Sequence, residues 1–262
     1  MQASTVYEVY AVRFAHFAPR RRTENFIGGD PHDGPMPFDY FVFAVKGPFG
    51  CWVVDTGFDA EVARRRNRTH LRCPGEGLRV IGIDPGAVEN VVLTHLHYDH
   101  AGNATLFPKA QFHLQEAEMA YATGRCMCHP FLKAGYDPED LAHVIGKLFA
   151  GRLTYHDGVS ELADGLSLHR IGGHTDGQQV LRVRTRRGWM VLASDALHFT
   201  ENLTTGRPFP HLYHAGAALD GFTVLRRLAD GDDMIIPGHD PSIMQRFPAA
   251  NEAAEGVAVR LD

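Results

Sequence analysis

The sequence predicts an α/β (α+β) fold, a sandwich of two β-sheets flanked by helices. Strand-like and helix-like segments are mixed in both halves of the chain. Four strand-like runs, well separated in the sequence, each lead to a residue that can bind a metal, and sites in layered α/β proteins gather at the carboxyl ends of strands. The 262 residues, 44% of them hydrophobic, can bury a large core, and no linker divides them. We therefore expect a single domain over residues 1–262.

We expect β structure at the start of the chain. Residues 6–14 alternate between apolar and polar side chains as a strand does, and residues 38–45 and 51–55 predict two strands joined by a hairpin-like turn. The Gly/Pro-rich stretch 28–35 is too irregular for a helix or strand, and it is either a plain surface loop or a loop that overhangs a pocket. Residues 60–68 predict a short, strongly basic helix.

The middle of the chain is expected to contain a strand at residues 110–114 and a helix at residues 115–121. Residues 122–151 are less regular and predict a helical insertion. Within it, Pro138 marks the start of a helix whose apolar side chains recur at helical spacing. The insertion is either an amphipathic segment packed on the core or a lid over the site.

Four predicted strands share one feature, which is that each ends shortly before a candidate ligand. They are residues 91–94 before His95, residues 166–171 before His174, residues 189–194 before Asp195 and residues 234–236 before His239. Because four independent strands would deliver polar residues from one end, we expect a shared site there.

The densest group of candidate ligands is His95, His97, Asp99 and His100, which follow a Val-rich strand. If the segment stays extended, its alternation places His95, His97 and Asp99 on one side. His100 then needs a bend at Asp99, which the following Ala-Gly-Asn sequence permits. A helix is less suitable, because residues two apart lie on opposing helix faces. The alternative is a histidine-rich surface loop.

This H-x-H-x-D-H pattern resembles the metallo-β-lactamase superfamily of binuclear metal hydrolases. Two further motifs are similar to elements of that family, namely His174-Thr175-Asp176-Gly177 and Pro237-Gly238-His239-Asp240. The resemblance spans about residues 40–245. It implies a four-layer αββα sandwich, the metallo-β-lactamase fold.

The resemblance also implies a set of seven metal ligands. They are His95, His97 and His174 for one divalent ion, Asp99, His100 and His239 for a second, and Asp195 as a bridge between the two ions. Five imidazoles and two carboxylates without a thiolate suit Zn²⁺, with iron, manganese and cobalt as alternatives. Asp55 lies in an Asp-Thr-Gly segment that the family also has, and it would support the metal loop without binding a metal.

Variants of the pattern separate the chemistries within the superfamily. Redox diiron members carry Glu where this chain has His97, and true β-lactamases generally lack the bridging aspartate, so Asp195 disfavours them. A glyoxalase II carries a C-terminal helical domain that binds glutathione, for which residues 240–262 are too short. Residues 195–202 resemble the N-acyl-homoserine-lactone lactonase family.

The function that this resemblance implies is the opening of a lactone ring to a hydroxy acid by a metal-bridging hydroxide. The substrate would be an N-acyl-homoserine lactone, as in quorum quenching, or another small lactone. The alternatives are a glyoxalase II-like thioesterase, another carboxylic-ester hydrolase, an RNA-processing nuclease of the same fold, and a metal-binding protein without catalysis. Because the lactonase family often forms dimers, a homodimer is also implied.

Asp99 and His198 are the candidate catalytic residues. The best-known lactonases place a Tyr that assists the carbonyl three residues after the bridging aspartate, where this chain has His198. A neutral imidazole can donate one hydrogen bond to an oxyanion, as a phenol does. The alternative is that His198 packs against its neighbours or caps the following turn. The candidates for the pocket wall are Phe14, Phe17, Phe26, Phe199 and Phe209.

Composition disfavours several partners. The net charge of −5 and the pI near 6.3 provide no basic field for nucleic acid, so the arginine runs at residues 20–22 and 64–66 are expected to be solvated surface. No run approaches the roughly 18 apolar residues of a membrane span, and the N-terminus lacks the layout of a signal peptide. We therefore expect a cytoplasmic protein with reduced thiols. Cys126-Met127-Cys128-His129 has ligands too few and too close for a tetrahedral zinc.

Overall fold

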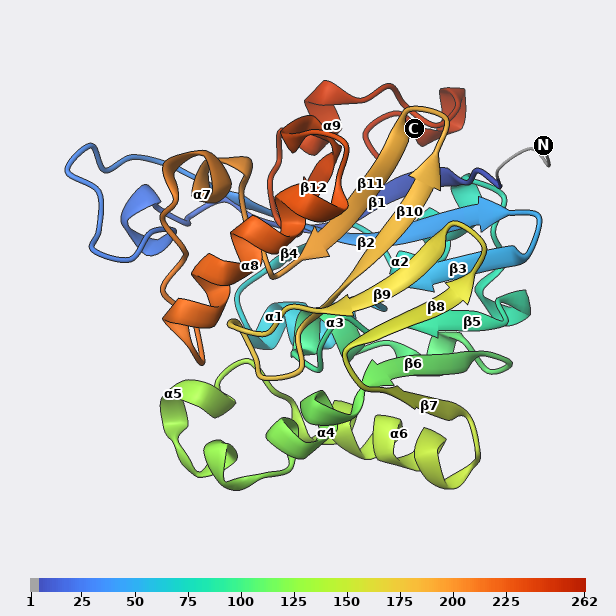
Figure 1. Cartoon of the computed structure of the whole chain (residues 1–262), viewed down its shortest axis with the longest axis horizontal. Helices are drawn as coiled ribbons and strands as arrows, with labels where there is room; N and C mark the ends of the chain where they lie inside the picture. The colour runs from blue at the N-terminus through green and yellow to red at the C-terminus, as the bar shows by residue number, and fades with distance from the viewer. Residues whose placement is uncertain (1–4) are drawn as a thin grey trace.

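The computed structural model describes residues 5–262 of the chain. Two β-sheets, one of eight strands and one of five, lie face to face (Figure 1). Helices cover the outer face of each sheet. The predicted sandwich of two sheets flanked by helices is confirmed.

The first sheet comes mainly from the N-terminal half of the chain. Its strands are β1 (Glu8–Phe17), β2 (Phe38–Gly47), β3 (Gly50–Val54), β4 (Thr69–His70), β5 (Asn90–Val92), β6 (Gln111–Gln115), β7 (Leu153–His156) and β13 (Ala258–Arg260). Their order is β13-β1-β2-β3-β5-β6-β7, with β4 paired to β1. β2 and β3 form the predicted hairpin, and β3, β5, β6 and β7 run parallel to one another. Parallel neighbours need crossover connections, which place helices on the outer face.

The second sheet comes from the C-terminal half. Its strands are β8 (Val159–Ala163), β9 (Leu166–Arg170), β10 (Gln179–Thr185), β11 (Gly188–Ser194) and β12 (Ile235–Pro237), in the order β12-β11-β10-β9-β8. β9 and β11 both run antiparallel to β10, and β12 runs parallel to β11. β9, β11 and β12 therefore point in the same direction, and their carboxyl ends lie at the same end of this sheet, as the sequence predicts.

The helices are short and lie between strands. They are α1 (Ala60–Arg65), α2 (Pro74–Val80), α3 (Tyr98–Ala101), α4 (Glu116–Ala122), α5 (Pro130–Lys133), α6 (Pro138–Phe149), α7 (Thr200–Thr205), α8 (Ala215–Leu228) and α9 (Ile243–Arg246). α6 begins at Pro138, as predicted, because the Asp137 carboxylate accepts a hydrogen bond from the Glu139 N–H at 3.2 Å and a proline is well suited to the first helical turn.

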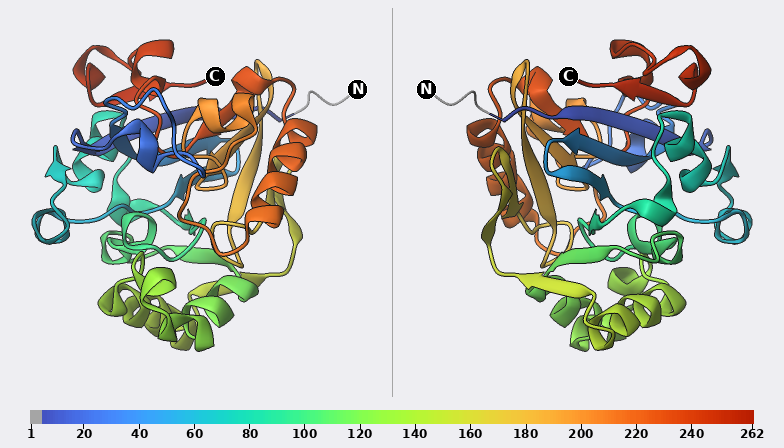
Figure 2. Two further views of the ribbon diagram at one scale, coloured as in Figure 1. Left: turned by 90° about the vertical axis from the view of Figure 1, so that its left-hand side faces the viewer. Right: turned by 90° about the vertical axis from the view of Figure 1, so that its right-hand side faces the viewer.

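Three clusters of buried hydrophobic side chains hold four layers together. Phe43 of β2 packs with Leu168 of β9 between the sheets. Helices α2, α4 and α6 cover the outer face of the first sheet, and α7 and α8 cover that of the second. Side chains alternate accordingly along β11, since Leu192 faces the first sheet and Val191 faces α8. Figure 2 shows α8 on the side of the second sheet that faces away from the first.

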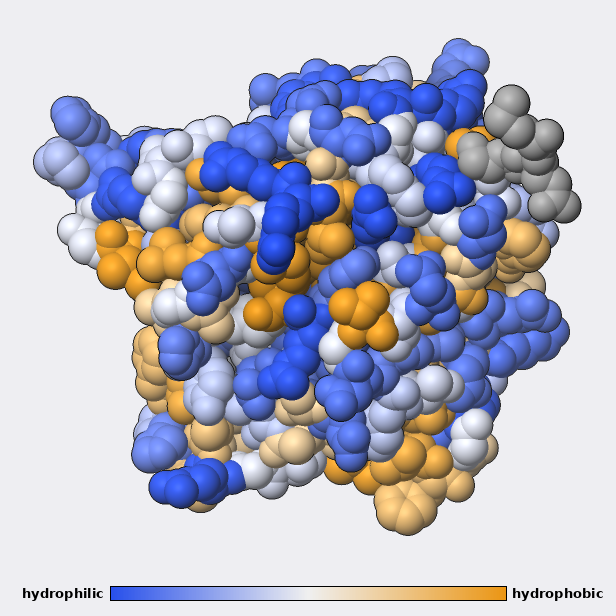
Figure 3. Space-filling model, viewed as in Figure 1, coloured by the Kyte–Doolittle hydropathy of each residue, from blue (hydrophilic) through white to orange (hydrophobic). Residues whose placement is uncertain are grey.

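Between residues 5 and 262, no helix is long and apolar enough to cross a bilayer. On the face shown in Figure 3, hydrophobic side chains gather over α7 and α8, and hydrophilic ones cover most of the remainder. The stretch 28–35 forms neither helix nor strand, and none of its residues lines the cleft described below. Of the two alternatives for this stretch, the structure supports the surface loop.

Candidate metal centre

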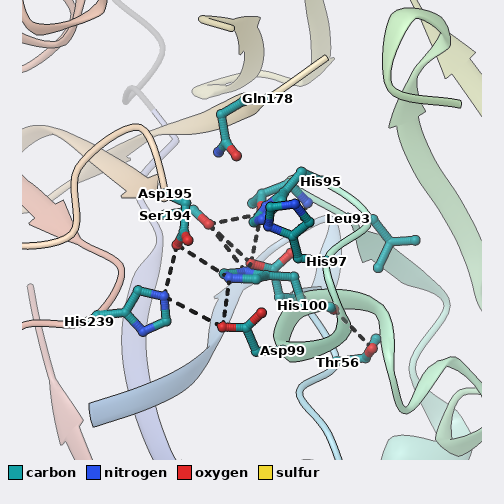
Figure 4. A network of polar contacts seen from close by, with 12 residues as sticks. Thr56, Leu93, His95, His97, Asp99, His100, Gln178, Ser194, Asp195 and His239 are labelled. Carbon is teal, nitrogen blue, oxygen red and sulfur yellow. Dashed lines mark hydrogen bonds and ion pairs between the residues drawn. The ribbon is translucent and has the colours of Figure 1, made fainter. Parts of the chain in front are cut away.

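All seven candidate ligands lie together at one end of the sandwich. Figure 4 shows six of them, namely His95, His97, Asp99, His100, Asp195 and His239. They come from the turn after β5 with α3, and from the loops that follow β9, β11 and β12. The first of these segments follows a strand of the first sheet, and the other three follow strands of the second sheet. The cluster therefore lies where the two sheets meet, and the expectation that four strand ends share one site agrees with the structure.

The ligand atoms form two neighbouring groups. In the first, His97 Nδ1 lies 2.9 Å from His174 Nε2, and a ring nitrogen of His95 lies within 4.8 Å of both. In the second, Asp99 Oδ2 lies 3.7 Å from His100 Nε2 and 3.8 Å from His239 Nε2. Ligand atoms that share one tetrahedral zinc at about 2.1 Å are roughly 3.4 Å apart. Both groups therefore have a spacing suited to one cation each.

The carboxylate of Asp195 lies between the two groups. Its Oδ1 is 3.3 Å from His100 Nε2 and 3.0 Å from His239 Nε2. Its Oδ2 is 3.5 Å from His174 Nε2. Because the two oxygens face different groups, Asp195 has the position that a bridging ligand needs.

The chain passes through residues 93–101 by a different path from the predicted one. Asp99 and His100 lie in the one-turn helix α3, so the segment is not extended through Asp99. The bend lies earlier, because His97 is extended while its carbonyl already accepts hydrogen bonds from the N–H groups of His100 and Ala101, both at 3.0 Å. A contact from outside the segment fixes this turn, since the Tyr98 N–H donates to the Gly135 carbonyl at 2.8 Å.

Acceptors behind the ligands orient three of the imidazoles. His100 Nδ1 lies 2.7 Å from Asp55 Oδ2, His174 Nδ1 lies 2.7 Å from the His211 carbonyl oxygen, and His239 Nδ1 lies 3.0 Å from the Asp39 carbonyl oxygen. In each case Nδ1–H donates outward, which leaves Nε2 as a lone-pair donor toward the centre.

Asp55 is buried behind the candidate ligands, as expected, and it contacts one of them directly, His100. Its carboxylate accepts hydrogen bonds from the N–H and the hydroxyl of Thr94, at 2.8 and 2.9 Å, besides contacting His100. The backbone of Asp55 has a φ of 63°, and Ser194, just before Asp195, has a φ of 45°. Non-glycine residues in this region are strained, and they persist where surrounding contacts fix them, often at functional sites.

Several buried polar atoms in the cluster are unpaired and fit a cation. His95 Nε2, His100 Nε2 and Asp195 Oδ1 are buried and form no hydrogen bond with residues 5–262. A buried polar group without a partner costs about 1–3 kcal/mol. Imidazole nitrogens and a carboxylate oxygen are suitable ligands for a divalent cation, so a bound ion would satisfy all three. The donor set therefore fits the metal that the sequence implies.

Burial also sets the charge of the imidazoles. It lowers the pKa of His95 and His97 well below the ordinary value, and it lowers the pKa of His174 to about 4. These rings are neutral at pH 7, which is the form that binds metals. For His100, burial again favours the neutral form, but the carboxylates of Asp195, Asp55 and Asp99 outweigh it and raise the pKa. A cation bound at Nε2 would supply positive charge beside these carboxylates and leave the His100 ring neutral as a ligand.

Sequence reasoning missed Glu118, a buried carboxylate on α4. It accepts hydrogen bonds from the Leu96 N–H at 3.0 Å, the Tyr136 hydroxyl at 2.9 Å and the Gly177 N–H at 3.1 Å. Burial raises its pKa despite these hydrogen bonds. Glu118 thus ties the His95–His97 turn to the loop that carries His174. Only its place in a short predicted helix marked it in the sequence.

Two glycines allow close packing at the ligands. A Cβ on Gly135 would lie 2.5 Å from His97 Cδ2, and a Cβ on Gly238 would lie 2.7 Å from Asp195 Oδ1. Gly238 belongs to a motif that the sequence marks. Gly135 has no such signal, because its contact with His97 depends on the fold of the insertion.

His198 lies beside the cluster and its ring is buried. The ring stacks on Phe209, with centroids 3.3 Å apart and planes within 7°. Nε2 lies 3.0 Å from Asp195 Oδ2, while Nδ1 is buried without a partner among the described residues. His198 also forms a further group of metal-ligand spacing with His174 and Asp195. Its predicted contact with the substrate stays a prediction.

A cleft of about 420 Å³ opens over the cluster, and its walls differ from the predicted ones. None of the five predicted phenylalanines lines it. Phe14, Phe26, Phe199 and Phe209 are buried in the protein, because strand alternation and packing turn them away. Aromatic side chains at the cleft are Phe38, Tyr40, Tyr98 and Phe131.

The arginine runs were expected to be solvated surface, and this is wrong for two of their members. Arg20 and Arg66 line the cleft together with Arg68, and all three are only partly exposed. Composition and net charge do not reveal which arginines of such a run point toward a cleft and which point into solvent. At the Cys126–His129 stretch, whose ligands are too few and too close for a tetrahedral zinc, no group of metal-ligand spacing forms within the described residues.

Comparison with known proteins gives consistent matches. The family model of the metallo-beta-lactamase superfamily matches residues 36–239. N-acyl homoserine lactonase AttM of Rhizobium radiobacter is 28% identical over 240 residues, which cover 86% of this chain and 89% of the relative.

Solved structures of lactonases have a similar fold. A quorum-quenching N-acyl homoserine lactone lactonase superposes with a TM-score of 0.77 at 20% identity, over 95% of this chain and 98% of the other. AidC, described as a dizinc quorum-quenching lactonase, superposes with a TM-score of 0.68 at 18% identity, over 91% and 89% of the two chains.

The packing of Gly135 against His97 can be tested. We expect Gly135→Ala to lower metal affinity by about 10- to 100-fold, because the added methyl displaces a proposed ligand. The measurement is metal content after dialysis against a series of buffered metal concentrations. Gly146→Ala on α6 is the control, since a Cβ there meets nothing within 4 Å. Equal metal retention by the two variants would contradict the role assigned to His97.

Proposed function

Because this chain belongs to the metallo-beta-lactamase superfamily, we propose that it is a metal-dependent hydrolase that opens the ring of a small lactone. The observation that carries the proposal is the position of Asp195, whose two oxygens face two separate groups of ligands. The match to lactonase AttM over most of both chains supports the lactone as substrate class.

We assign two divalent ions to this centre, with Zn²⁺ as the first choice. His95, His97 and His174 would hold one ion, Asp99, His100 and His239 the other, and Asp195 would bridge them. When bound, such ions activate a water near neutral pH, polarise the carbonyl and stabilise negative charge on oxygen.

The residues of the chain then have separate tasks in the hydrolysis. A water oxygen adds to the carbonyl carbon, the ring C–O bond breaks, and the ring oxygen takes a proton to give the hydroxy acid. We assign the transfer of that proton to Asp99, whose carboxylate lines the cleft: it takes the proton from the attacking water and gives it to the ring oxygen. We assign to His198 a hydrogen bond to the developing oxyanion. The outward Nδ1 contacts of His100, His174 and His239 keep the imidazoles oriented during the reaction.

Metal content is the first test of this proposal. Elemental analysis is expected to find about two metal ions per chain, because seven ligands exceed what one tetrahedral zinc uses. Asp195→Ala is expected to lose more activity than Asp55→Ala, since only Asp195 faces both groups. A reproducible single ion per chain would contradict the two-ion assignment. A larger loss of activity in Asp55→Ala than in Asp195→Ala would mean that the roles of the two aspartates are exchanged.

The substrate class is tested with a panel of lactones, aryl esters and S-lactoylglutathione, assayed on protein of known metal content. We expect ring opening of lactones to be faster than thioester hydrolysis, in line with the lactonase relatives. Preferred turnover of S-lactoylglutathione would indicate a thioesterase instead. Retained metal without turnover of any of these compounds would indicate a metal-binding protein that is not an enzyme.

The role of His198 gives a further prediction. His198→Ala is expected to lower the turnover rate by roughly 10- to 1000-fold while metal content stays at the wild-type level, because it removes an oxyanion donor without removing a proposed ligand. His198→Tyr is expected to recover part of the rate. The measurement is turnover of fully metallated protein between pH 6 and 9. Unchanged turnover of His198→Ala would exclude the residue from the reaction, and loss of metal would identify it as a ligand.

A further inference from the structure

Three arginines at the cleft have no acidic partner. Arg20, Arg66 and Arg68 line the cavity above the ligands, and none forms an ion pair within 4.0 Å with a carboxylate of residues 5–262. Neighbouring arginines behave differently, since Arg22 pairs with Glu201 and Arg65 pairs with Asp137. These three guanidinium groups are thus not directly paired with a carboxylate in the described part of the chain.

Aromatic rings hold these guanidinium groups in place. The Cζ of Arg20 lies 3.8 Å from the centroid of Phe38, and that of Arg68 lies 4.0 Å from the centroid of Phe17. Stacking on an aromatic face is favourable for a guanidinium and restricts its motion. The two charges are therefore preorganised at the cleft instead of extending into solvent.

The hydrogen bonds of the three arginines distinguish their roles. Arg66 donates through both terminal nitrogens to the carbonyls of Ala134 and Tyr136, so it fixes the wall next to His97. Arg20 donates through Nε and Nη2 only, and Arg68 through Nε and Nη1 only. Nη1 of Arg20 and Nη2 of Arg68 form no hydrogen bond with the described residues. These two nitrogens are the donors available to a ligand.

Arg20 lies close to the metal ligands. The ring of Phe38, on which Arg20 stacks, is itself stacked on His239, with centroids 4.5 Å apart and planes within 1°. One aromatic ring therefore separates the guanidinium from a proposed ligand. Arg20 and His239 both line the cleft, so a substrate that reacts at the proposed ligands has Arg20 in the wall of the same cavity.

The acidic groups near the cleft form no direct ion pair with these arginines within residues 5–262. Asp99 and Asp195 face the histidines, as described above. Glu24 lies at the mouth of the cleft, but its carboxylate accepts a hydrogen bond from the Arg21 N–H at 2.8 Å. Burial is the main cause that lowers the pKa of Arg20; the Glu24 carboxylate opposes this shift, and the positive charge of Arg68 adds to it. An anion between Arg20 and Arg68 would relieve this repulsion.

We propose that the substrate carries an anionic oxygen group, a carboxylate or a phosphate, which Arg20 and Arg68 bind while its lactone ring lies at the metal ligands. Arg66 is a positioning residue that holds the cleft wall. This inference rests on the proposed hydrolase function and specifies its substrate class. An acidic lactone is thereby favoured over an N-acyl homoserine lactone, whose acyl chain is uncharged and offers the arginines no counter-charge.

The test compares three lactones that share one ring and differ only in a substituent: a carboxylate, a phosphate monoester or a primary amide. We expect kcat/KM to be about 10- to 100-fold higher for one or both anionic lactones than for the amide, because hydrogen bonds to charged groups are the stronger ones. The difference is expected mainly in KM. Added salt should lower kcat/KM for the anionic lactones and leave kcat/KM for the amide unchanged.

Variants then assign this preference to the arginines. Arg20→Gln and Arg68→Gln are expected to reduce kcat/KM at least tenfold more for the preferred anionic lactone than for the amide, and Arg20→Lys and Arg68→Lys should retain part of the preference. Metal content and circular dichroism establish that each variant is folded. The control is Arg64→Gln, because Arg64 is exposed on α1 and does not line the cleft.

The outcomes separate this inference from the proposed function. If no lactone is hydrolysed, the proposed function fails. If the amide is hydrolysed as well as the anionic lactones, the inference is wrong and the lactonase stands. If the anionic preference persists in the glutamine variants, the anion binds to the metal ions and not to Arg20 and Arg68, which also overturns the inference.

Discussion

The buried carboxylate of Asp55 is the contact on which the arrangement of the site depends. One oxygen accepts a hydrogen bond from the Thr94 N–H, and the other contacts the Thr94 hydroxyl and His100 Nδ1. The Thr94 hydroxyl lies in turn 2.8 Å from the Ser194 hydroxyl, at the end of β11 in the second sheet. Asp55 therefore joins the strand ends of both sheets and orients a proposed ligand. Its strained backbone is consistent with a position that these contacts fix.

The sequence predicted the fold, and the segments that meet at the site, wherever a local pattern carried the information. The metallo-β-lactamase fold is confirmed, and the motifs around His95, His174 and His239 mark segments that the structure brings together. The predictions failed where tertiary contacts decide. A hydrogen bond from Tyr98 to Gly135 turns the chain into α3 before Asp99, and no period in the sequence encodes that contact. Glu118 was missed because the loops that it joins are distant in the chain.

The candidate ligands and the residues of the cleft wall come from different parts of the fold, so the ligands alone do not determine the substrate. The ligands come from strand ends that the fold places together, whereas the wall comes from Arg20, Arg68 and the insertion at residues 122–151, which lie outside those strands. Loops of this kind tolerate change without loss of the core. Phe131 and Ala134 of the insertion line the cleft, so that segment contributes to the wall as well as packing on the first sheet.

The long sequence separation of the site contacts has a consequence for folding. The hydrogen bond from His239 Nδ1 to the Asp39 carbonyl joins residues 200 positions apart, and the hydrogen bond between the Thr94 and Ser194 hydroxyls joins residues 100 positions apart. Closing such long loops is slow, so the complete ligand set can form only after both sheets have docked. An ion that binds only this assembled set stabilises the native state by mass action. The melting temperature of the protein should then rise with free metal concentration, and chelation should expose the chain to proteolysis.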